Sequence, residues 1–490
     1  MNTSLSHAVK NASQPMLIDG QWVADSSTCI ETVNPATGRP NRSVCAATAE
    51  HVDAAVRAGR RAAAAPAWRN ALPHQRARVL SAIADGMERE ADTLARLQMM
   101  ENGKVWRECR NQVASAVATF RYYAAVCETI GSEVTPARGG YISMTTYEPY
   151  GVIAAITPWN SPLTMEAQKV APALAAGNSV VLKPSEVTPS TALELGRIAL
   201  AAGLPPGLLN VLPGTGAQAG AALVAHEGVG MISFTGGTQS GRAIARQAAA
   251  NLIPVALELG GKSPHILFED ADLDSAVKEV AGGIFEGSGQ SCVAGSRLFV
   301  QRGVLESFVE RLVRHARDIR VDMPDAEGAQ MGPIATFAHR EKVESMVARA
   351  VDEGGMVLTG GERMEGKLSG GSFYRPTIVA GLSNRSFLAQ QEVFGPVLCV
   401  LPFDDEQDLI AQANDSAYGL AAGIWTRDFA RAWRVGRALQ AGVVWINTYK
   451  QLSISTPFGG FKESGIGREK GVSGMRLYQQ SKAFYLGLGS

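Results

Sequence analysis

The fold of this chain is decided by the stretch that begins Gly151-Val-Ile-Ala-Ala-Ile-Thr157 and ends Val255-Ala-Leu-Glu258. Short apolar runs within it alternate with longer segments of helical composition. The apolar runs predict strands at 151–157, 179–183, 208–212, 230–234 and 255–258. The segments between them predict helices at 162–176, 188–203, 217–226 and 240–251. This alternation indicates an α/β fold with a doubly wound parallel sheet, whose ligands bind beyond the carboxyl ends of the strands.

The flanking sequence predicts a hairpin, a helical region and a second domain. Asp19-Gly20 lies between two short apolar runs and indicates a type I′ turn, and helical composition dominates 51–65 and 72–127. From Gly260 onward a second α/β pattern predicts strands at 266–268, 297–300, 419–426 and 442–446, with helices at 273–285, 304–319, 337–353, 406–414 and 429–439. Two runs outside both patterns, 141–147 and 483–486, have the mixed polarity of strands that pair with a partner subunit.

Composition limits the class of protein. The 490 residues, 46% of them hydrophobic, suffice for two or three domains with sizeable cores. Lys+Arg and Asp+Glu both number 46, a balance without the basic excess of proteins that bind nucleic acids or membrane surfaces. The six cysteines include no CxxC pair, which indicates reduced thiols in a cytoplasmic protein and no zinc site. Residues 1–14 lack the apolar core of a signal peptide, and no apolar run approaches the length of a membrane span.

Polar residues follow the predicted strands of the first sheet. Asn160 follows the first strand, Lys183 ends the second, Thr235-Gly-Gly-Thr238 follows the fourth and Glu258 ends the fifth. The two glycines of the fourth segment would let backbone N–H groups approach a phosphate at the start of a helix, although glycines that open helices are common without one. Asn160 could equally cap the helix that follows it, and Lys183 could be an ordinary solvated lysine.

Two residues are candidates for covalent chemistry. Cys292 lies among small residues in Gly287-Ser-Gly-Gln-Ser-Cys292, a setting that leaves backbone room around the sulfur, although most isolated cysteines are inert core residues. Glu258 lies between leucines at a strand end. It is either a surface carboxylate at the edge of the sheet or a partly desolvated general base with a raised pKa.

Taken together, seven segments in the same order closely resemble the NAD(P)-dependent aldehyde dehydrogenase superfamily. The resemblance covers nearly the whole chain, from the Asp19-Gly20 hairpin to the C-terminal strand, and the set is more specific than any single glycine-rich loop. The matching motifs are Pro158-Trp-Asn160, Lys183-Pro-Ser-Glu186, Phe234-Thr-Gly-Gly-Thr238, Leu257-Glu-Leu-Gly-Gly-Lys262, Gly289-Gln-Ser-Cys292, Glu392-Val-Phe-Gly-Pro396 and Pro457-Phe-Gly-Gly-Phe-Lys462.

The resemblance implies catalytic roles for four residues. Cys292 is the expected nucleophile, which attacks the aldehyde carbon to give a thiohemiacetal and then a thioester. The side-chain amide of Asn160 and the backbone N–H of Cys292 would form the oxyanion hole. Glu258 would activate the water that releases the carboxylic acid, and Lys169 completes the implied catalytic set. Free cysteine has a pKa of about 8.5, so either the site favours the thiolate or Glu258 accepts the thiol proton.

The resemblance also implies a nicotinamide cofactor. Lys183 and Glu186 would bind the adenosine ribose, Gly237 would lie under the pyrophosphate, and Glu392 would bind the nicotinamide ribose beside Phe394. The remaining implied cofactor contacts are Thr157, Trp159, Ser185, Phe234, Thr235, Gly236, Thr238 and Leu259. A carboxylate at position 186 suits two free ribose hydroxyls and repels a 2′-phosphate, so NAD is favoured over NADP, although Lys183 could still accept a phosphate.

The family architecture implies three parts. A cofactor domain is expected from 1–127 and 149–259, a catalytic domain from 260–462, and a small β oligomerisation hairpin from 128–148 joined by 463–490. This segment implies a homodimer or a homotetramer. The resemblance implies no metal site.

Departures from the family pattern bear on the substrate. Ser161 and Gln168 stand where many relatives have bulky aromatic residues, and the loop 449–455 is more polar than a pocket for fatty aldehydes. A medium-sized, partly polar aldehyde is therefore expected, such as a semialdehyde or an amino-aldehyde.

Two alternatives to this function remain. Glu258 and the lack of an evident CoA site argue against a CoA-acylating dehydrogenase, and retention of the catalytic set argues against a non-catalytic structural or binding member.

Overall fold

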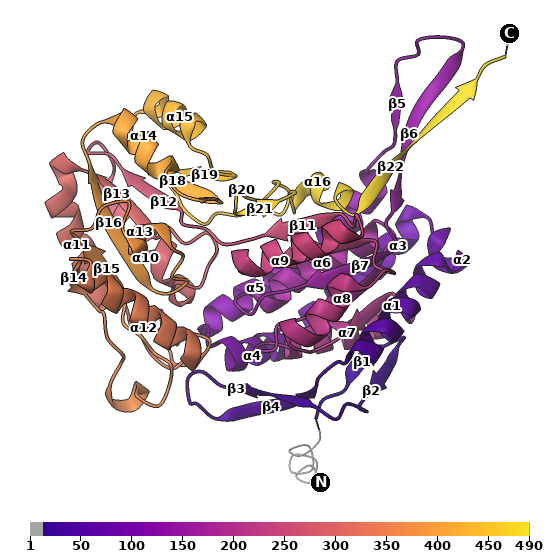
Figure 1. Ribbon diagram of the computed structural model, residues 1–490, viewed down its shortest axis with the longest axis horizontal. Coiled ribbons are helices and arrows are strands. Elements are labelled where there is room, and N and C mark those ends of the chain that lie inside the picture. The colour runs from indigo at the N-terminus through magenta and orange to yellow at the C-terminus, as the bar shows by residue number, and fades with distance from the viewer. Residues whose placement is uncertain (1–12, 490) are drawn as a thin grey trace.

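The computed structural model describes residues 13–489 (Figure 1). Residues 1–12 lie outside the described part of the chain. They make up most of the segment 1–14, for which the sequence predicts no signal peptide. Two α/β bodies lie side by side, and an arm of three strands extends away from the first body. Among residues 13–489, no helix combines the length and the apolar character needed to cross a bilayer.

The first body is built on an eight-stranded sheet in the order β2-β1-β9-β8-β7-β10-β11-β21. Its strands are β1 (Met16–Ile18), β2 (Gln21–Val23), β7 (Val152–Ile156), β8 (Ser179–Lys183), β9 (Leu209–Val211), β10 (Met231–Thr235), β11 (Val255–Glu258) and β21 (Gly465–Ile466). The five strands from β9 to β11 are parallel, which confirms the predicted doubly wound sheet. The chain order reverses between β7 and β10, and such sheets bind ligands at the reversal.

The predicted hairpin is also confirmed. β1 and β2 pair antiparallel, and Asp19 and Gly20 have φ angles of 51° and 76°. Two successive positive φ angles are the mark of a type I′ turn. The hairpin adds an antiparallel edge to the parallel sheet, because β1 pairs with β9.

Helices cover both faces of the first sheet. Ile153 and Ala155 of β7 point into one apolar core, and Val152 and Ala154 point into the other, as the period of a strand requires. The helices of this body are α1 (Ala49–Ala64), α2 (Pro66–Arg69), α3 (Pro73–Arg89), α4 (Ala91–Asn102), α5 (Trp106–Thr129), α6 (Pro162–Ala175), α7 (Ser190–Ala201), α8 (Ala221–Ala225), α9 (Thr238–Ala250) and α16 (Gly471–Arg476).

Two predicted helices differ from the structure. The helical region 72–127 is not continuous but forms α3, α4 and α5, with a non-helical backbone at Glu90 and a left-handed Gly103 after α4. A Cβ on Gly103 would lie 2.5 Å from Pro333 and 2.8 Å from Pro35, so glycine permits this close approach. The region 217–226 divides into a π-helical turn, Gly216–Gly220, and the short helix α8.

The second body contains a seven-stranded sheet in the order β14-β15-β16-β13-β12-β18-β19. Its strands are β12 (Pro264–Leu267), β13 (Arg297–Gln301), β14 (Met356–Thr359), β15 (Thr377–Ala380), β16 (Val397–Phe403), β18 (Ala421–Trp425) and β19 (Val443–Ile446). Its helices are α10 (Leu273–Phe285), α11 (Leu305–Asp318), α12 (Phe337–Asp352), α13 (Phe387–Gln390), α14 (Glu406–Asn414) and α15 (Phe429–Ala438). The second α/β pattern is confirmed, but the sequence analysis missed β14, β15 and β16. Pro402 within β16 weakens the strand signal, since proline cannot donate to a sheet.

The two strands expected at 141–147 and 483–486, outside both α/β patterns, pair with each other. β6 (Tyr141–Pro149) lies between β5 (Glu133–Thr135) and β22 (Gln479–Gly487) in the arm. The boundary expected at 463 differs from the structure, because β21 pairs with β11 and α16 packs on α6 within the first body. Only β22 of that terminal segment joins the arm. Two short ribbons complete the fold, β3 (Cys29–Val33) with β4 (Pro40–Cys45) and β17 (Tyr418–Gly419) with β20 (Phe461–Lys462).

Candidate active site

The carboxyl edge of the first sheet gathers the polar residues that follow its strands. The register pairs Ile156 with Lys183 across β7 and β8, and Thr235 with Glu258 across β10 and β11. Thr157 follows β7, and its backbone N–H donates to the carbonyl of Lys183. Parallel neighbours end together, so these side chains share one edge, as the sequence predicts.

Cys292 comes from the second body and precedes β13 instead of following a strand. Its loop turns through Gly287, Ser288 and Gly289, whose φ angles are 65°, 57° and 71°. A Cβ on Gly261 would collide with the carbonyl oxygen of Cys292, and a Cβ on Gly289 would collide with a neighbouring backbone segment. Small residues therefore surround Cys292 because several backbone segments meet there.

One cavity of about 520 Å³ is lined by residues of both bodies. Ten of the predicted site residues line it: Trp159, Asn160, Thr235, Gly236, Gly237, Glu258, Leu259, Cys292, Glu392 and Phe394. The fold thus brings a thiol, a carboxylate and a carboxamide that are distant in sequence to one space.

The other seven predicted residues lie outside the cavity wall: Thr157, Lys169, Lys183, Ser185, Glu186, Phe234 and Thr238. Lys183 is only 3% exposed, and its Nζ lies 3.3 Å from Oε2 of Glu186. Burial lowers the pKa of Lys183, which the neighbouring Glu186 carboxylate partly offsets. The alternative that Lys183 is a solvated lysine is therefore wrong.

The side chain of Asn160 is directed at the loop that carries Cys292. Its Nδ2 donates to the carbonyl oxygen of Gln290 over 3.0 Å. The cap position of α6 is Ser161, and no side chain caps this helix. The alternative role of Asn160 as a helix cap is therefore absent, and the carboxamide is held beside the loop that carries Cys292.

Glu258 is buried, not a surface carboxylate. It is 6% exposed, and its Oε2 has no hydrogen-bond partner in the described part of the chain. Burial, reinforced by the negative charge of Glu469, raises the pKa of Glu258 well above its usual value, against the opposing influence of Lys169. A carboxyl group in this state can hold a proton near neutral pH and exchange it with a neighbour.

The thiol of Cys292 is also held in its protonated form. Burial raises its pKa to about 12, and the negative charges of Glu258 and Glu392 act in the same direction. The ammonium group of Lys470 opposes them. Activation of this sulfur therefore needs a proton acceptor, and Glu258 is a carboxylate that lines the same cavity.

Lys169 lies in the core beneath the cavity. Its Nζ donates to Oε1 of Glu469 over 2.6 Å and to Oγ of Ser233 over 3.0 Å. Both members of the Lys169–Glu469 pair are buried, and Glu469 lines the cavity. Lys169 therefore acts on the cavity through Glu469 and through its charge on Glu258.

One end of the cavity is lined by aromatic and acidic residues. The rings of Trp159 and Phe394 meet edge to face with centroids 5.3 Å apart, and the ring of Trp159 lies 5.5 Å from that of His339. Oε1 of Glu392 accepts the backbone N–H of Gly261 over 3.0 Å. This end offers a flat apolar surface beside a fixed carboxylate.

The same edge presents polar groups without protein partners. The buried hydroxyls of Thr157, Thr235 and Thr238 lack hydrogen bonds within residues 13–489. No side chain caps the N-terminus of α9, and the space beside Gly237 is open. Free hydroxyls and a free helix N-terminus suit a ligand that carries both hydroxyl and phosphate groups.

Several residues that line the cavity were missed. Glu469 and Lys470 stand in a polar stretch, and Gln112 and Ser115 stand on the polar side of α5. Charged and polar positions of this kind usually mark a solvated surface, so no local signal distinguishes them. Only the packing of the two bodies turns them toward the cavity.

Residues 22–484 match the model of the Aldehyde dehydrogenase family. The chain is 41% identical to aminoaldehyde dehydrogenase 1, peroxisomal, of Pisum sativum, over 97% of this chain and 96% of the relative. It is 40% identical to the (Z)-2-((N-methylformamido)methylene)-5-hydroxybutyrolactone dehydrogenase of Acinetobacter baylyi, over 96% of each chain. The structure of the NAD+ complex of the aldehyde dehydrogenase from Bacillus cereus is similar, with 38% identity, a TM-score of 0.96 and coverage of 100% of this chain and 99% of that one.

Proposed function

The chain belongs to the aldehyde dehydrogenase family, and from this membership we propose that it oxidises an aldehyde to a carboxylic acid with NAD. The single observation that carries the proposal is the shared cavity of Cys292, Glu258 and Asn160. These three residues supply a nucleophile, a base and an oxyanion donor, which oxidation through a covalent acyl-enzyme requires.

NAD is the proposed cofactor. The unpartnered threonine hydroxyls and the uncapped N-terminus of α9 fit its ribose and pyrophosphate groups. Glu186 would accept the two adenosine ribose hydroxyls and disfavour a 2′-phosphate, while Glu392 would accept the hydroxyls of the nicotinamide ribose. NAD, when bound, supplies the acceptor for the hydride of the substrate.

Bond formation to the substrate is assigned to Cys292. Its thiol proton passes to Glu258, and the sulfur attacks the aldehyde carbon to form a thiohemiacetal. The carboxamide of Asn160 and the backbone N–H of Cys292 donate to the oxygen that becomes negative. Oxidation of this carbon leaves the acyl group on Cys292 as a thioester.

Release of the acid is assigned to Glu258. Glu258 first releases the thiol proton to solvent, and its carboxylate then takes a proton from a water molecule, which attacks the thioester carbon and frees the Cys292 thiolate. Lys169 is proposed as a positioning residue, because its ion pair with Glu469 sets the charge around Glu258.

The proposed substrate is a medium-sized, partly polar aldehyde, such as a semialdehyde or an amino-aldehyde. Ser161 and Gln168 line the cavity and support this class. The expected polarity of the loop 449–455 needs correction, because Leu452 and Ile454 are the members of that loop that line the cavity. The substrate therefore meets polar groups on α5 and α6 and apolar groups on the loop.

The test is a kinetic survey of aldehydes with purified protein. NADH and free acid should form in equal amounts with NAD, and NADP should be a poorer acceptor. Formation of acyl-CoA without free acid would identify a CoA-acylating enzyme, and the absence of any turnover would favour a non-catalytic member. A strong preference for long-chain alkanals would contradict the substrate class alone.

The proposed assembly is a homodimer or a homotetramer. Large apolar side chains on the arm are exposed in the single chain, among them Val134, Phe484, Tyr485 and Leu486. Burial of such a surface against a second copy would stabilise an oligomer. Light scattering coupled to gel filtration measures the mass, and a monomeric mass at micromolar concentration would contradict this proposal.

A further inference from the structure

The ribbon of β3 and β4 places two cysteines directly opposite each other. Cys29 of β3 and Cys45 of β4 are partners in the register of the two strands. The adjacent pair is hydrogen-bonded, because the backbone N–H of Ala46 donates to the carbonyl of Thr28 over 2.9 Å. Hydrogen-bonded and non-hydrogen-bonded pairs alternate along an antiparallel ribbon, so Cys29 and Cys45 form a non-hydrogen-bonded pair. The N–H of Cys45 accordingly points away from Cys29 and donates to the carbonyl of Gln14.

This pairing has the geometry that a disulfide requires. The Cα atoms of a non-hydrogen-bonded pair lie about 4.5 Å apart, within the range of about 4.4–6.8 Å over which disulfides form. The hydroxyl of Ser13 identifies the face that the two cysteines share. Its Oγ lies 3.0 Å from Sγ of Cys29 and 2.8 Å from Oγ of Ser43, and Ser43 shares a face of β4 with Cys45 two positions later.

The two thiols differ in their access to solvent. Cys29 is exposed, whereas the other five cysteines are buried or half-buried, and Cys45 is only 2% exposed. The hydroxyl of Ser13 donates to Sγ of Cys29, a contact that stabilises the thiolate. Burial, reinforced by the neighbouring Cys29, raises the pKa of Cys45 and keeps it a thiol. An oxidant from solvent therefore reaches Cys29 first, and Cys45 is the thiol placed to react with the product.

The ribbon that carries these cysteines joins the two bodies (Figure 1). At its base, Cys45 belongs to an apolar core of the first body. At its tip, the carbonyl of Pro35 accepts the backbone N–H of Ser372 over 2.8 Å and the hydroxyl of the same residue over 3.0 Å. Ala36 packs beside Phe373 in a small apolar cluster of the second body. A bond between the two strands would therefore restrain a segment that holds the bodies together.

We propose that Cys29 and Cys45 form a site of thiol oxidation, at which a hydroperoxide converts the pair into a disulfide that cross-links the ribbon. The Cys29 thiolate attacks one peroxide oxygen, so that an S–O bond forms, the O–O bond breaks and the second oxygen leaves as an alcohol, or as water from hydrogen peroxide. The sulfur of Cys45 then attacks that of Cys29, and hydroxide leaves with the Cys45 thiol proton as water. The two sulfurs supply the two electrons that reduce the hydroperoxide. This site does not depend on the proposed oxidation of aldehydes at Cys292.

The test is peptide mapping of the whole protein after treatment with hydrogen peroxide. Free thiols are alkylated, and the chain is digested with trypsin without reduction. Cys29 then lies in the peptide 11–42, since trypsin does not cut before Pro40, and Cys45 lies in the peptide 43–57. We expect the two peptides to be joined and to separate on treatment with dithiothreitol. Conversion of Cys29 to its sulfinic acid without any cross-linked peptide would overturn the proposal.

Variants assign the two thiols to their steps. Cys45→Ser removes the second thiol, so labelling of the Cys29 sulfenic acid by dimedone should rise by about tenfold or more, because the fast reaction with a thiol held in place is lost. Cys29→Ser should leave Cys45 unoxidised. Cys127→Ser, at a buried cysteine of α5, is the matched control and should cross-link like the parent. Equal dimedone labelling of the parent and Cys45→Ser would overturn the role of Cys45.

The restraint on the ribbon is measured by thermal unfolding. Cys292→Ala serves as the background, so that oxidation of the thiol in the cavity does not affect the comparison. The cross-linked protein should melt about 2–4 °C above its dithiothreitol-reduced form. The double variant Cys29→Ser/Cys292→Ala should show no such rise. An unchanged melting temperature in fully cross-linked protein would overturn the restraint.

Discussion

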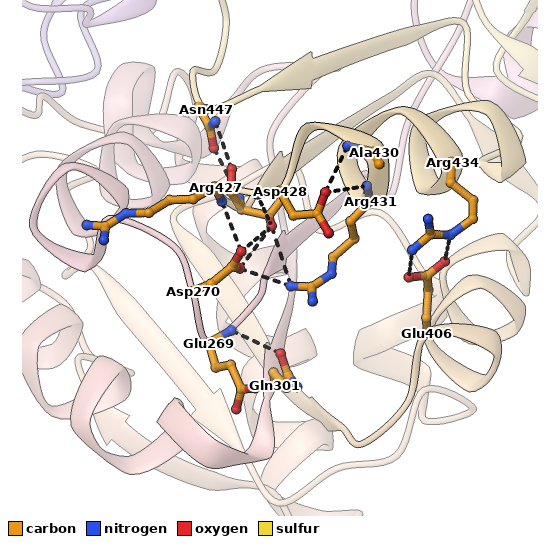
Figure 2. Close-up of polar contacts among 11 residues, drawn as sticks. Glu269, Asp270, Gln301, Glu406, Arg427, Asp428, Ala430, Arg431, Arg434 and Asn447 are labelled. Atoms are coloured by element: carbon orange, nitrogen blue, oxygen red, sulfur yellow. Dashed lines mark hydrogen bonds and ion pairs between the residues drawn. The ribbon is translucent and has the colours of Figure 1, made fainter.

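The carboxyl edges of the two sheets both carry polar residues. Several of these residues lack hydrogen-bond partners in the described chain at the first sheet, whereas those at the second sheet are hydrogen-bonded to one another. At the edge of the first sheet, the hydroxyls of Thr157 and Thr235 and one carboxylate oxygen of Glu258 have no hydrogen-bond partner within residues 13–489. At the edge of the second sheet, the polar residues that follow β12, β18 and β19 bind one another (Figure 2).

Figure 2 shows how the second edge is closed. The carboxylate of Asp270 accepts the hydroxyl of Thr426 over 2.9 Å and Nη1 of Arg431 over 3.0 Å. The side-chain amide of Asn447 accepts the backbone N–H of Thr426 and donates to its carbonyl oxygen, and Asp428 caps α15. These groups satisfy one another and leave little capacity for a ligand.

The comparison teaches which strand ends can serve a ligand. Both sheets follow the rule that polar residues gather beyond the carboxyl ends, yet the cavity lies at this edge only in the first sheet. In the second sheet the cavity lies at the amino edge, because Cys292 precedes β13 and Glu392 precedes β16. The lack of hydrogen-bond partners, more than a position beyond the strand ends, therefore distinguishes the carboxyl edge that lines the cavity.

The largest expected effect is at the sulfur that faces the open edge. Cys292→Ala should lower kcat by about 10⁴-fold or more, since loss of a covalent nucleophile has effects of this order. NADH formation at saturating aldehyde measures it. The exposed Cys29→Ala on β3 is the matched control, and a Cys292→Ala enzyme within tenfold of the parent would refute the assignment.

Glu258→Gln comes next. We expect kcat to fall by about 10²- to 10⁴-fold, because the general base is lost while the shape of the side chain is kept. If a second proton acceptor serves the sulfur, a rapid-mixing experiment will show one equivalent of NADH followed by slow turnover, and mass spectrometry will find the acyl group on Cys292. Turnover at the parental rate would remove Glu258 from both proposed proton transfers.

The pH dependence of the reactivity of Cys292 tests the protonation state of the groups in the cavity. The pKa values of Cys292 and Glu258 are both raised, so their reactive, deprotonated forms become more abundant as pH rises. Alkylation of Cys292 by iodoacetamide should accelerate by up to about tenfold per unit between about pH 6 and about pH 9. The measurement is the loss of activity with time, and a rate that is flat over this interval would show a thiolate already formed at low pH.

A substitution at the closed edge should affect stability and leave catalysis unchanged. Asp270→Asn weakens the contacts with Thr426 and Arg431 and should lower the free energy of unfolding by about 1–2 kcal/mol, a modest value because the ion pair is partly exposed. Urea denaturation measures the change. A fall in kcat without a change in stability would mean that this edge takes part in the reaction.

The smallest effects come from a matched pair of threonines. Thr426→Val removes a bonded hydroxyl and should destabilise the fold by about 1–2 kcal/mol. Thr235→Val removes an unpaired hydroxyl, so the melting temperature should hold or rise while KM for NAD increases a few-fold. Equal destabilisation by the two substitutions would contradict the distinction between an open and a closed edge.

Local patterns predicted most of the fold and the core of the site. The apolar runs of 151–258 give all five parallel strands, and the shared direction of these strands places Lys183, Thr235 and Glu258 at one edge. The strands β14, β15 and β16 escaped prediction, because they are short or contain proline and lack the clear spacing of the first sheet. The state of Glu258 was also left open, since burial depends on what the second body covers.

The sequence by itself determined that a doubly wound sheet carries candidate groups at its carboxyl edge, because strand period and crossover direction are local properties of the chain. Only the tertiary structure decided which groups are free and which are paired. Lys169 pairs with Glu469, which is 300 positions away in the sequence, and Asp270 binds Thr426, which is 156 positions away. Such pairings follow from the packing of distant segments, so no window of sequence contains them.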